Sequence, residues 1–198
     1  MIATSESSRI VTDLDALVVS GERFRCIYVD PPWRYDNRAS RGAAENHYPT
    51  MSLEEITALP VRDLAADQSH LFLWTTTTFL FDAYPIMQAW GFTYADMFVW
   101  CKPQMGLGNY WRVSHEMLLL GVRGDLSFRD NSYRSWAIFP RGKHSEKPEQ
   151  VRLMLEKVSP GPRLELFGRK SQPGWTVYGD QIERDLFFAA AVATDCAR

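Results

Sequence analysis

An acid, two prolines and a tryptophan directly follow an apolar run that covers residues 24–29. They are Asp30, Pro31, Pro32 and Trp33. Each proline fixes its own φ and keeps the preceding residue extended, so the tetrapeptide is a stiff hook that holds a carboxylate and carbonyl groups in fixed relation. Such a hook suits the positioning of an aromatic amine, and we take its four residues as candidate catalytic residues. The alternative is an ordinary turn that ends a strand, with Trp33 in the core.

Other common chemistries leave no signature in the chain. It contains no Gly-x-Gly-x-x-Gly fingerprint, no Gly-Lys-Ser/Thr phosphate loop and no Gly-x-Ser-x-Gly elbow. The four histidines lack ligand spacing, and the three cysteines form neither a metal set nor an even disulfide framework. These absences argue against a dinucleotide oxidoreductase and a P-loop nucleotidase, and we expect no bound metal.

Composition sets the size and the compartment that we expect. The 198 residues, 45% of them apolar, suffice for one well-buried domain, which we place at 1–198 with a core at about 10–184 and a tail at 185–198. The net charge of −2 gives no global attraction to nucleic acid, so local patches must supply any such binding. The chain lacks a signal-peptide pattern and any long apolar stretch, and it has few cysteines, which predicts a cytoplasmic protein without a membrane span.

Five apolar runs predict the strands that must carry the hook. Most are continuous rather than alternating, as in sheets that are buried on both faces. They are 24–29, 71–74, 97–100, 117–120 and 163–167.

Helical patterns lie between several of these runs. Ser52 and Glu55 form a capping box, and a second helix is expected at 79–90. A third has Pro148 in its first turn and an apolar stripe behind it. This alternation of strand and helix predicts an α/β domain with a mostly parallel sheet and helices on both faces.

The expected site lies beyond the carboxyl ends of the strands, where open α/β sheets bind ligands. Asp30 stands at one such end. Two long stretches, 33–51 and 125–146, are poor in periodic apolar residues, and we interpret them as loops over this site. Between residues 123 and 147, six Lys or Arg outnumber three acids, which favours a nucleic-acid contact or, alternatively, a solvated loop.

Further motifs occur in a fixed order after the hook. They are Tyr48-Pro49-Thr50-Met51, Leu71-Phe72-Leu73-Trp74, Trp90-Gly91-Phe92, Val99-Trp100-Cys101-Lys102, His115-Glu116, Gly121-Val122-Arg123-Gly124, His144-Ser145-Glu146-Lys147-Pro148, Glu165-Leu166-Phe167-Gly168-Arg169 and Gly179-Asp180-Gln181. With the hook, they resemble the MT-A seventy family of adenine-N6 methyltransferases over residues 24 to 182. The blocks at 109–112 and 134–136 resemble its prokaryotic and phage branch.

This resemblance implies S-adenosyl-L-methionine as the cofactor, and a Rossmann-like sheet permuted so that the catalytic motif precedes the cofactor motif. It assigns Glu165 to the cofactor ribose and Lys147 to the methionine carboxylate. The other implied cofactor-binding residues are Asp30, Arg169, Asp180 and Gln181, with a further contact near residues 13 to 15. Where the family commonly has Asn, this chain has Asp180.

The amine of adenine is a weak nucleophile, because its lone pair is delocalised into the base. If Asp30 and the carbonyl of Pro31 each accept one N–H, the nitrogen is biased toward tetrahedral geometry and its developing charge is stabilised. The implied substrate-binding residues are Tyr35, Tyr48, Lys102, Arg112, Glu116, Arg134 and Arg141. Trp33 and the two tyrosines are candidates for stacking on a base that has left its duplex, with core packing as the alternative.

The expected activity is methylation of the N6 amine of adenine in DNA, in a bacterial or phage-infected cell. The same reaction on RNA is the first alternative. A non-catalytic subunit that binds nucleic acid is the second, and an intact hook argues against it. Methylation of a small amine is the third, and the arginine-bearing loops disfavour it. A homodimer or a related partner subunit is a further possibility.

Overall fold

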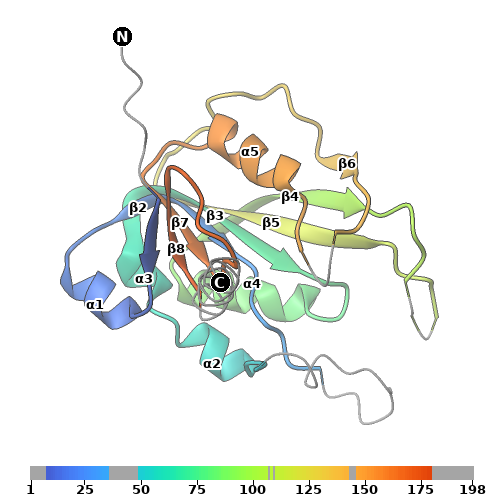
Figure 1. Ribbon diagram of the computed structural model, residues 1–198, viewed down its shortest axis with the longest axis horizontal. Coiled ribbons are helices and arrows are strands. Elements are labelled where there is room, and N and C mark those ends of the chain that lie inside the picture. Colours follow the sequence, from blue (N-terminus) through green and yellow to red (C-terminus); the bar gives the residue numbers. More distant parts are fainter. Residues whose placement is uncertain (1–7, 36–48, 107, 109, 143–145, 180–198) are drawn as a thin grey trace, which may run out of the picture.

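A computed structural model describes residues 8–35, 49–106, 108, 110–142 and 146–179. Its centre is one sheet of eight strands. They are β1 (Arg9–Val11), β2 (Phe24–Val29), β3 (Ala65–Thr75), β4 (Thr93–Cys101), β5 (His115–Arg123), β6 (Trp136–Ile138), β7 (Arg163–Leu166) and β8 (Trp175–Tyr178). Across the sheet the order is β1-β8-β7-β2-β3-β5-β4-β6 (Figure 1).

Seven of these strands point in the same direction. The eighth strand, β5, runs the other way and is antiparallel to both β3 and β4. The carboxyl ends of β2, β4 and β7 therefore lie at one edge of the sheet, which we call the site edge. The expected mostly parallel α/β sheet is confirmed, with the hook of β2 preceding the acid of β7 in the chain.

Helices cover both faces of the sheet unevenly. α1 (Leu14–Val19), α2 (Leu53–Thr57), α3 (Val61–Leu64) and α4 (Leu80–Ala89) lie on one face, and α5 (Glu149–Val158) lies on the other (Figure 1). The capping box at the start of α2 is present, with Ser52 and Glu55 bonded reciprocally. Pro148 stands at the N-cap of α5 rather than in its first turn, so this helix begins one residue later than expected.

The side chains of β2 alternate between two hydrophobic cores. Ile27 and Val29 pack toward the four-helix face, whereas Cys26 and Tyr28 pack toward α5. Because both faces are covered, each of these side chains is buried and contributes roughly 1.5–3 kcal/mol where it is aliphatic and large. This double burial explains why the run is continuously apolar. It also fixes the position of β2 in the sheet, and with it the position of the hook at the site edge.

Several elements were not expected from the sequence. β6 lies inside the stretch 125–146 that we interpreted as a loop, and β1, β8, α1 and α3 had no prediction. The stretch 33–51 and the tail at 185–198 fall largely or wholly outside the described residues. Within the described part of the chain, no helix has the length and the apolar character that crossing a bilayer requires.

Candidate active site

The hook turns away from the sheet directly after β2. The Trp33 N–H donates to the Pro31 carbonyl at 2.9 Å, and the Met51 N–H donates to the Pro32 carbonyl at 2.8 Å. The hook is thus tied to the segment that leads into α2. These bonds and the two fixed φ angles hold the Asp30 carboxylate at the site edge.

The indole of Trp33 is only 6% exposed. Its Nε1–H donates to the Trp74 carbonyl at 3.2 Å, and its ring stacks on Phe79 with centroids 5.0 Å apart. Of the two roles considered for this residue, core packing is therefore the one seen in the structure. Trp33 still borders the cavity described next, so its contribution to catalysis stays a prediction.

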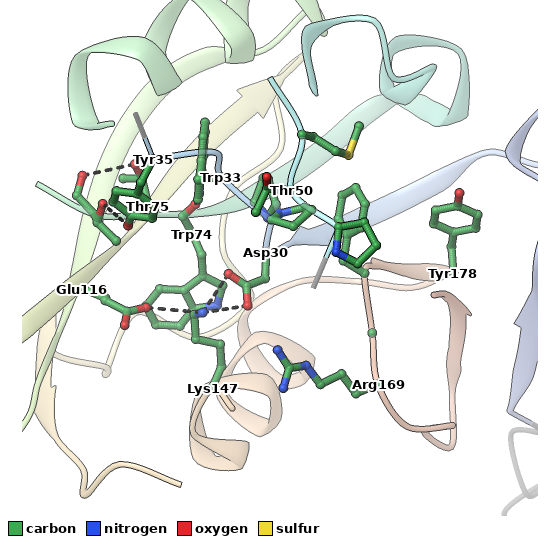
Figure 2. Close-up of a pocket in the computed structure, with 17 residues that line it drawn as sticks. Asp30, Trp33, Tyr35, Thr50, Trp74, Thr75, Glu116, Lys147, Arg169 and Tyr178 are labelled. Atoms are coloured by element: carbon green, nitrogen blue, oxygen red, sulfur yellow. Dashed lines mark hydrogen bonds and ion pairs between the residues drawn. The ribbon is translucent and has the colours of Figure 1, made fainter. Parts of the chain in front are cut away.

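A cavity of about 320 Å³ opens at the site edge in front of the hook (Figure 2). Its volume falls within the range that small-molecule and cofactor sites occupy. The hook supplies one wall, and the ends of β3, β5, β7 and β8 supply others. Besides the hook, its lining includes Tyr35, Thr50, Trp74, Thr75, Thr76, Glu116, Lys147, Phe167, Gly168, Arg169 and Tyr178.

Lys147 lies between two carboxylates in this cavity (Figure 2). Its Nζ donates to both oxygens of Asp30, at 2.7 and 2.6 Å, and lies 3.3 Å from Glu116 Oε2. Glu116 in turn pairs with Lys102, at the carboxyl end of β4. Four side chains thus form a charge chain of alternating sign, and we keep this name for Lys102, Glu116, Lys147 and Asp30.

The charge chain sets the protonation of its members. Burial raises the pKa of Asp30, and the adjacent Lys147 ammonium opposes this rise. Burial alone would lower the pKa of Lys147, but Asp30 and Glu116 outweigh it and the net pKa is raised. Lys147 therefore stays cationic and counteracts burial at Asp30, although the net pKa of Asp30 remains above its ordinary value.

Glu165 of β7 carries an oxygen without a partner. Its Oε2 is buried and accepts no hydrogen bond from any described residue. Burial raises the pKa of this carboxyl to about 7, with Arg152 opposing. A buried acceptor without a donor calls for an explanation, and a ligand hydroxyl would supply the missing hydrogen bond.

The backbone beside Glu165 is built for close approach. A Cβ on Gly168 would lie 2.4 Å from Val177 Cγ1 and 3.1 Å from Glu165 Cδ, so no larger residue fits there without movement. Phe167, just before it, has a φ of 65°, a left-handed conformation that costs a non-glycine residue about 1–2 kcal/mol. Strain of this kind concentrates at ligand sites, and Phe167 lines the cavity.

The remaining predicted residues divide into three groups. Tyr35 and Arg169 line the cavity; the Tyr35 hydroxyl shares a hydrogen bond with Thr76, and the Arg169 guanidinium is directed toward Asp30 (Figure 2). Three arginines are exposed and do not line it, namely Arg112, Arg134 and Arg141. Arg134 instead borders a separate cavity of about 250 Å³ beside α5. Three further residues fall outside the described residues, namely Tyr48, Asp180 and Gln181.

Some residues of the site were missed by sequence reasoning. Trp74, Thr75 and Thr76 line the cavity at the end of β3, where the rule for strand ends could have found them. Conversely, Asp13, near the implied N-terminal cofactor contact, caps α1 by accepting the backbone N–H groups of Asp15 and Ala16.

A sequence model of one protein family, described as MT-A70, matches residues 24–181. The chain belongs to the MT-A70 family. The matched range runs from the start of β2 past the end of β8, so it includes the hook, the whole charge chain and Glu165.

Similar proteins within and beyond bacteria support this membership of the MT-A70 family. The chain is 31% identical over 183 residues to the Type II methyltransferase M.MunI of a Mycoplasma species, covering 81% of this chain and 78% of that protein. It is 29% identical over 174 residues to the N(6)-adenosine-methyltransferase catalytic subunit METTL3 of Homo sapiens, covering 81% of this chain. It spans only 28% of METTL3, and 42% of mouse METTL4, an N(6)-adenine-specific methyltransferase to which it is 25% identical.

Proposed function

We propose that this protein transfers a methyl group from S-adenosyl-L-methionine to the exocyclic N6 amine of adenine in DNA. The observation that carries the proposal is the Asp30 carboxylate, held by two prolines and by Lys147 at a cavity of an MT-A70 domain. DNA is favoured over RNA because M.MunI, a bacterial Type II methyltransferase, is similar over most of its own length. The relative named for adenosine methylation, METTL3, is covered over a much smaller share.

The residues present fit the cofactor on the side of β7. The unpartnered Oε2 of Glu165 suits ribose hydroxyls, because a carboxylate accepts from two donors. Phe167 and Tyr178, whose rings meet edge to face 6.1 Å apart, form an aromatic wall beside it. Arg169 and Lys147 are the cations that would face the cofactor carboxylate. When bound, the cofactor supplies an electrophilic methyl on a sulfonium.

The hook would act on the amine by accepting its protons. Asp30 already accepts from Lys147, yet a carboxylate offers about four lone-pair sites, so it can take an amine N–H as well. The Pro31 carbonyl accepts from the Trp33 N–H and offers a second lone pair in the same way. Two such bonds would draw the amine toward tetrahedral geometry and stabilise its growing positive charge.

Lys147 limits the basicity of Asp30. The ammonium opposes the rise that burial causes in the pKa of Asp30, and a neutral aromatic amine is too weak an acid for a carboxylate to deprotonate. Asp30 would therefore orient the amine and stabilise charge rather than remove a proton before attack. Proton loss then follows methyl transfer. The alignment of the amine with the methyl group and the exclusion of water carry the remaining rate enhancement.

The Glu165→Gln variant should bind S-adenosyl-L-homocysteine about 10- to 100-fold more weakly in calorimetry, because an acceptor for the ribose becomes partly a donor. The variant should also change the pH dependence of stability of the ligand-free protein. The pKa of Glu165 is raised to about 7 on folding, so its stabilising contribution is present at acid pH and is lost as the pH rises through about 7. The Gln variant should lack this loss.

An Asp67→Asn variant serves as the control, since Asp67 is exposed and stands near the start of β3, away from the site edge. Unchanged affinity in the Glu165→Gln variant would remove Glu165 from the cofactor site. An unchanged pH profile of thermal unfolding would show that its carboxyl is not perturbed.

The function is tested by transfer of labelled methyl to matched single-stranded DNA, double-stranded DNA and RNA, with mass spectrometry of the product nucleosides. We expect N6-methyladenine in DNA. Methylation of RNA alone would favour the alternative function, methylation of the N6 amine of adenine in RNA. Tight cofactor binding without methylation of any polymer would contradict a self-sufficient DNA methyltransferase, and would favour a subunit that requires a related partner or a homodimer. Action on cellular or phage DNA would place the protein in the cytoplasm.

A further inference from the structure

The connection between β4 and β5 projects from the site edge. Since β4 is parallel to β2, its last residue, Cys101, lies at the same edge as Asp30. The Lys102 N–H donates to the Ser114 carbonyl at 2.7 Å, which adds one rung to the antiparallel ladder. Figure 1 shows the connection extending beyond the sheet. We call its described residues, 102–106, 108 and 110–114, the finger.

Two glycines let the limbs of the finger meet. A Cβ on Gly106 would lie 2.1 Å from the Val113 carbonyl oxygen, and one on Gly108 would lie 2.1 Å from the Trp111 carbonyl oxygen. Contacts this short exclude any side chain. The finger is therefore a narrow ribbon of closely packed backbone rather than a wide loop.

The far part of the finger presents two adjacent aromatic side chains to solvent. Tyr110 is 97% exposed and Trp111 is 86% exposed. By contrast, Trp33 and Trp74 at the cavity are at most 6% exposed, and each donates its indole N–H inside the protein. These two indoles are thus held by packing and hydrogen bonds inside the protein, whereas the two rings of the finger are open to a partner.

The finger and one neighbouring segment carry cations but no acid in their sequences. Residues 102–114 contain Lys102 and Arg112 but no acid, and the same holds for 131–145, which contains three Lys or Arg. The two segments meet at Arg141, whose guanidinium lies 3.0 Å from the position that a Cβ on Gly106 would take. Aromatic rings interleaved with cations are the combination that binds unstacked bases and phosphates. The finger of a second copy of this chain carries the same cations and no acid, so contact between two fingers would bring like charges together.

We propose that the finger holds duplex DNA at the site edge by stacking Tyr110 and Trp111 on the bases that become exposed when the target adenine leaves the helix. This assignment rests on the proposed function, since it requires an extruded adenine in the cavity. Arg112 and Arg141 bind the adjacent phosphates. Lys102, the first residue of the finger, pairs with Glu116. Through the charge chain it is connected to Asp30 of the hook.

The test measures the affinity of variants for a fluorescent duplex that the wild-type protein methylates. Tyr110→Ala and Trp111→Ala should each weaken binding about tenfold, as expected when one base loses its stacking partner. The slope of affinity against salt concentration should not change, because neither ring neutralises a phosphate. Trp111→Phe should recover most of the affinity.

Tyr94→Ala is the matched control, because Tyr94 is an exposed aromatic residue near the opposite end of β4. It should bind the duplex like wild type, and all variants should bind S-adenosyl-L-homocysteine equally well. Wild-type duplex affinity in both alanine variants would overturn the finger assignment while leaving the methyltransferase function intact. A lowered molar mass in light scattering, without loss of duplex affinity, would assign the rings to a second copy of the chain. A wild-type protein that methylates only RNA, or no polymer, would overturn the proposed function itself and with it the duplex partner.

Discussion

Replacement of Asp30 by Asn should lower the rate of methyl transfer by about 10²- to 10³-fold or more, while the affinity for S-adenosyl-L-homocysteine changes no more than a few fold. The amide has nearly the same shape as the carboxylate, but it carries no charge and one of its two polar atoms is a donor. It therefore loses the acceptor that draws out the lone pair of the amine. Single-turnover rates with DNA in excess, together with calorimetry, separate these two effects.

Asp30→Asn also leaves Lys147 with only one carboxylate, so the folding of the variant needs a direct check. We expect cooperative thermal unfolding, because Glu116 still pairs with the Lys147 ammonium. Asp67→Asn controls for the loss of one negative charge elsewhere. A turnover close to that of wild type in a folded Asp30→Asn protein would exclude the hook from the reaction.

Replacement of Lys147 by Met should shift the acid limb of the pH profile of kcat to higher pH, by about one unit or more. The sign follows from the surroundings of Asp30. Burial raises its pKa, Lys147 lowers it, Glu116 raises it and Arg169 lowers it least, so removal of the ammonium takes away the main influence that opposes burial and the pKa rises further. Asp30 must be ionised to act, so activity is then lost at a higher pH as the solution is acidified.

The Glu116→Gln variant should move the same limb in the opposite direction. Its carboxylate raises the pKa of Asp30 and also competes for Lys147, so its removal lowers the pKa of Asp30. Opposite shifts in the two variants identify Asp30 as the titrating group. If both variants shift the limb in the same direction, or neither shifts it, another group controls the acid side of the profile.

The sequence predicts the main strands of the fold well, because continuous apolar runs mark them. A run such as 24–29 is apolar throughout, and only burial on two faces accounts for that. The composition of a run does not indicate whether the strand is parallel or antiparallel to its neighbours. The run that became β5 reads like its parallel neighbours, and the strand β6 is too short to rise above the polar residues around it.

The candidate site is predicted less completely. The hook and Glu165 stand at strand ends, so the topology of the fold indicates them. The charge chain depends on one side chain of β5 and on others that follow β2, follow β4 or precede α5, and these meet only in three dimensions. The role of Lys147 at the cofactor stays a prediction, and its contacts with Asp30 and Glu116 are an addition that no pattern in one dimension could have revealed.

The reversed direction of β5 has a practical consequence for target choice. A connection between parallel strands must cross back over the sheet, usually through a helix, whereas the antiparallel β4 and β5 are joined directly at the site edge. The rung between Cys101 and His115 closes the sheet below the segment that joins them. Loops tolerate changes of length far better than the strands that they join. The segment between Lys102 and Ser114 can therefore be exchanged for a different recognition element without altering the charge chain or the register of the catalytic sheet.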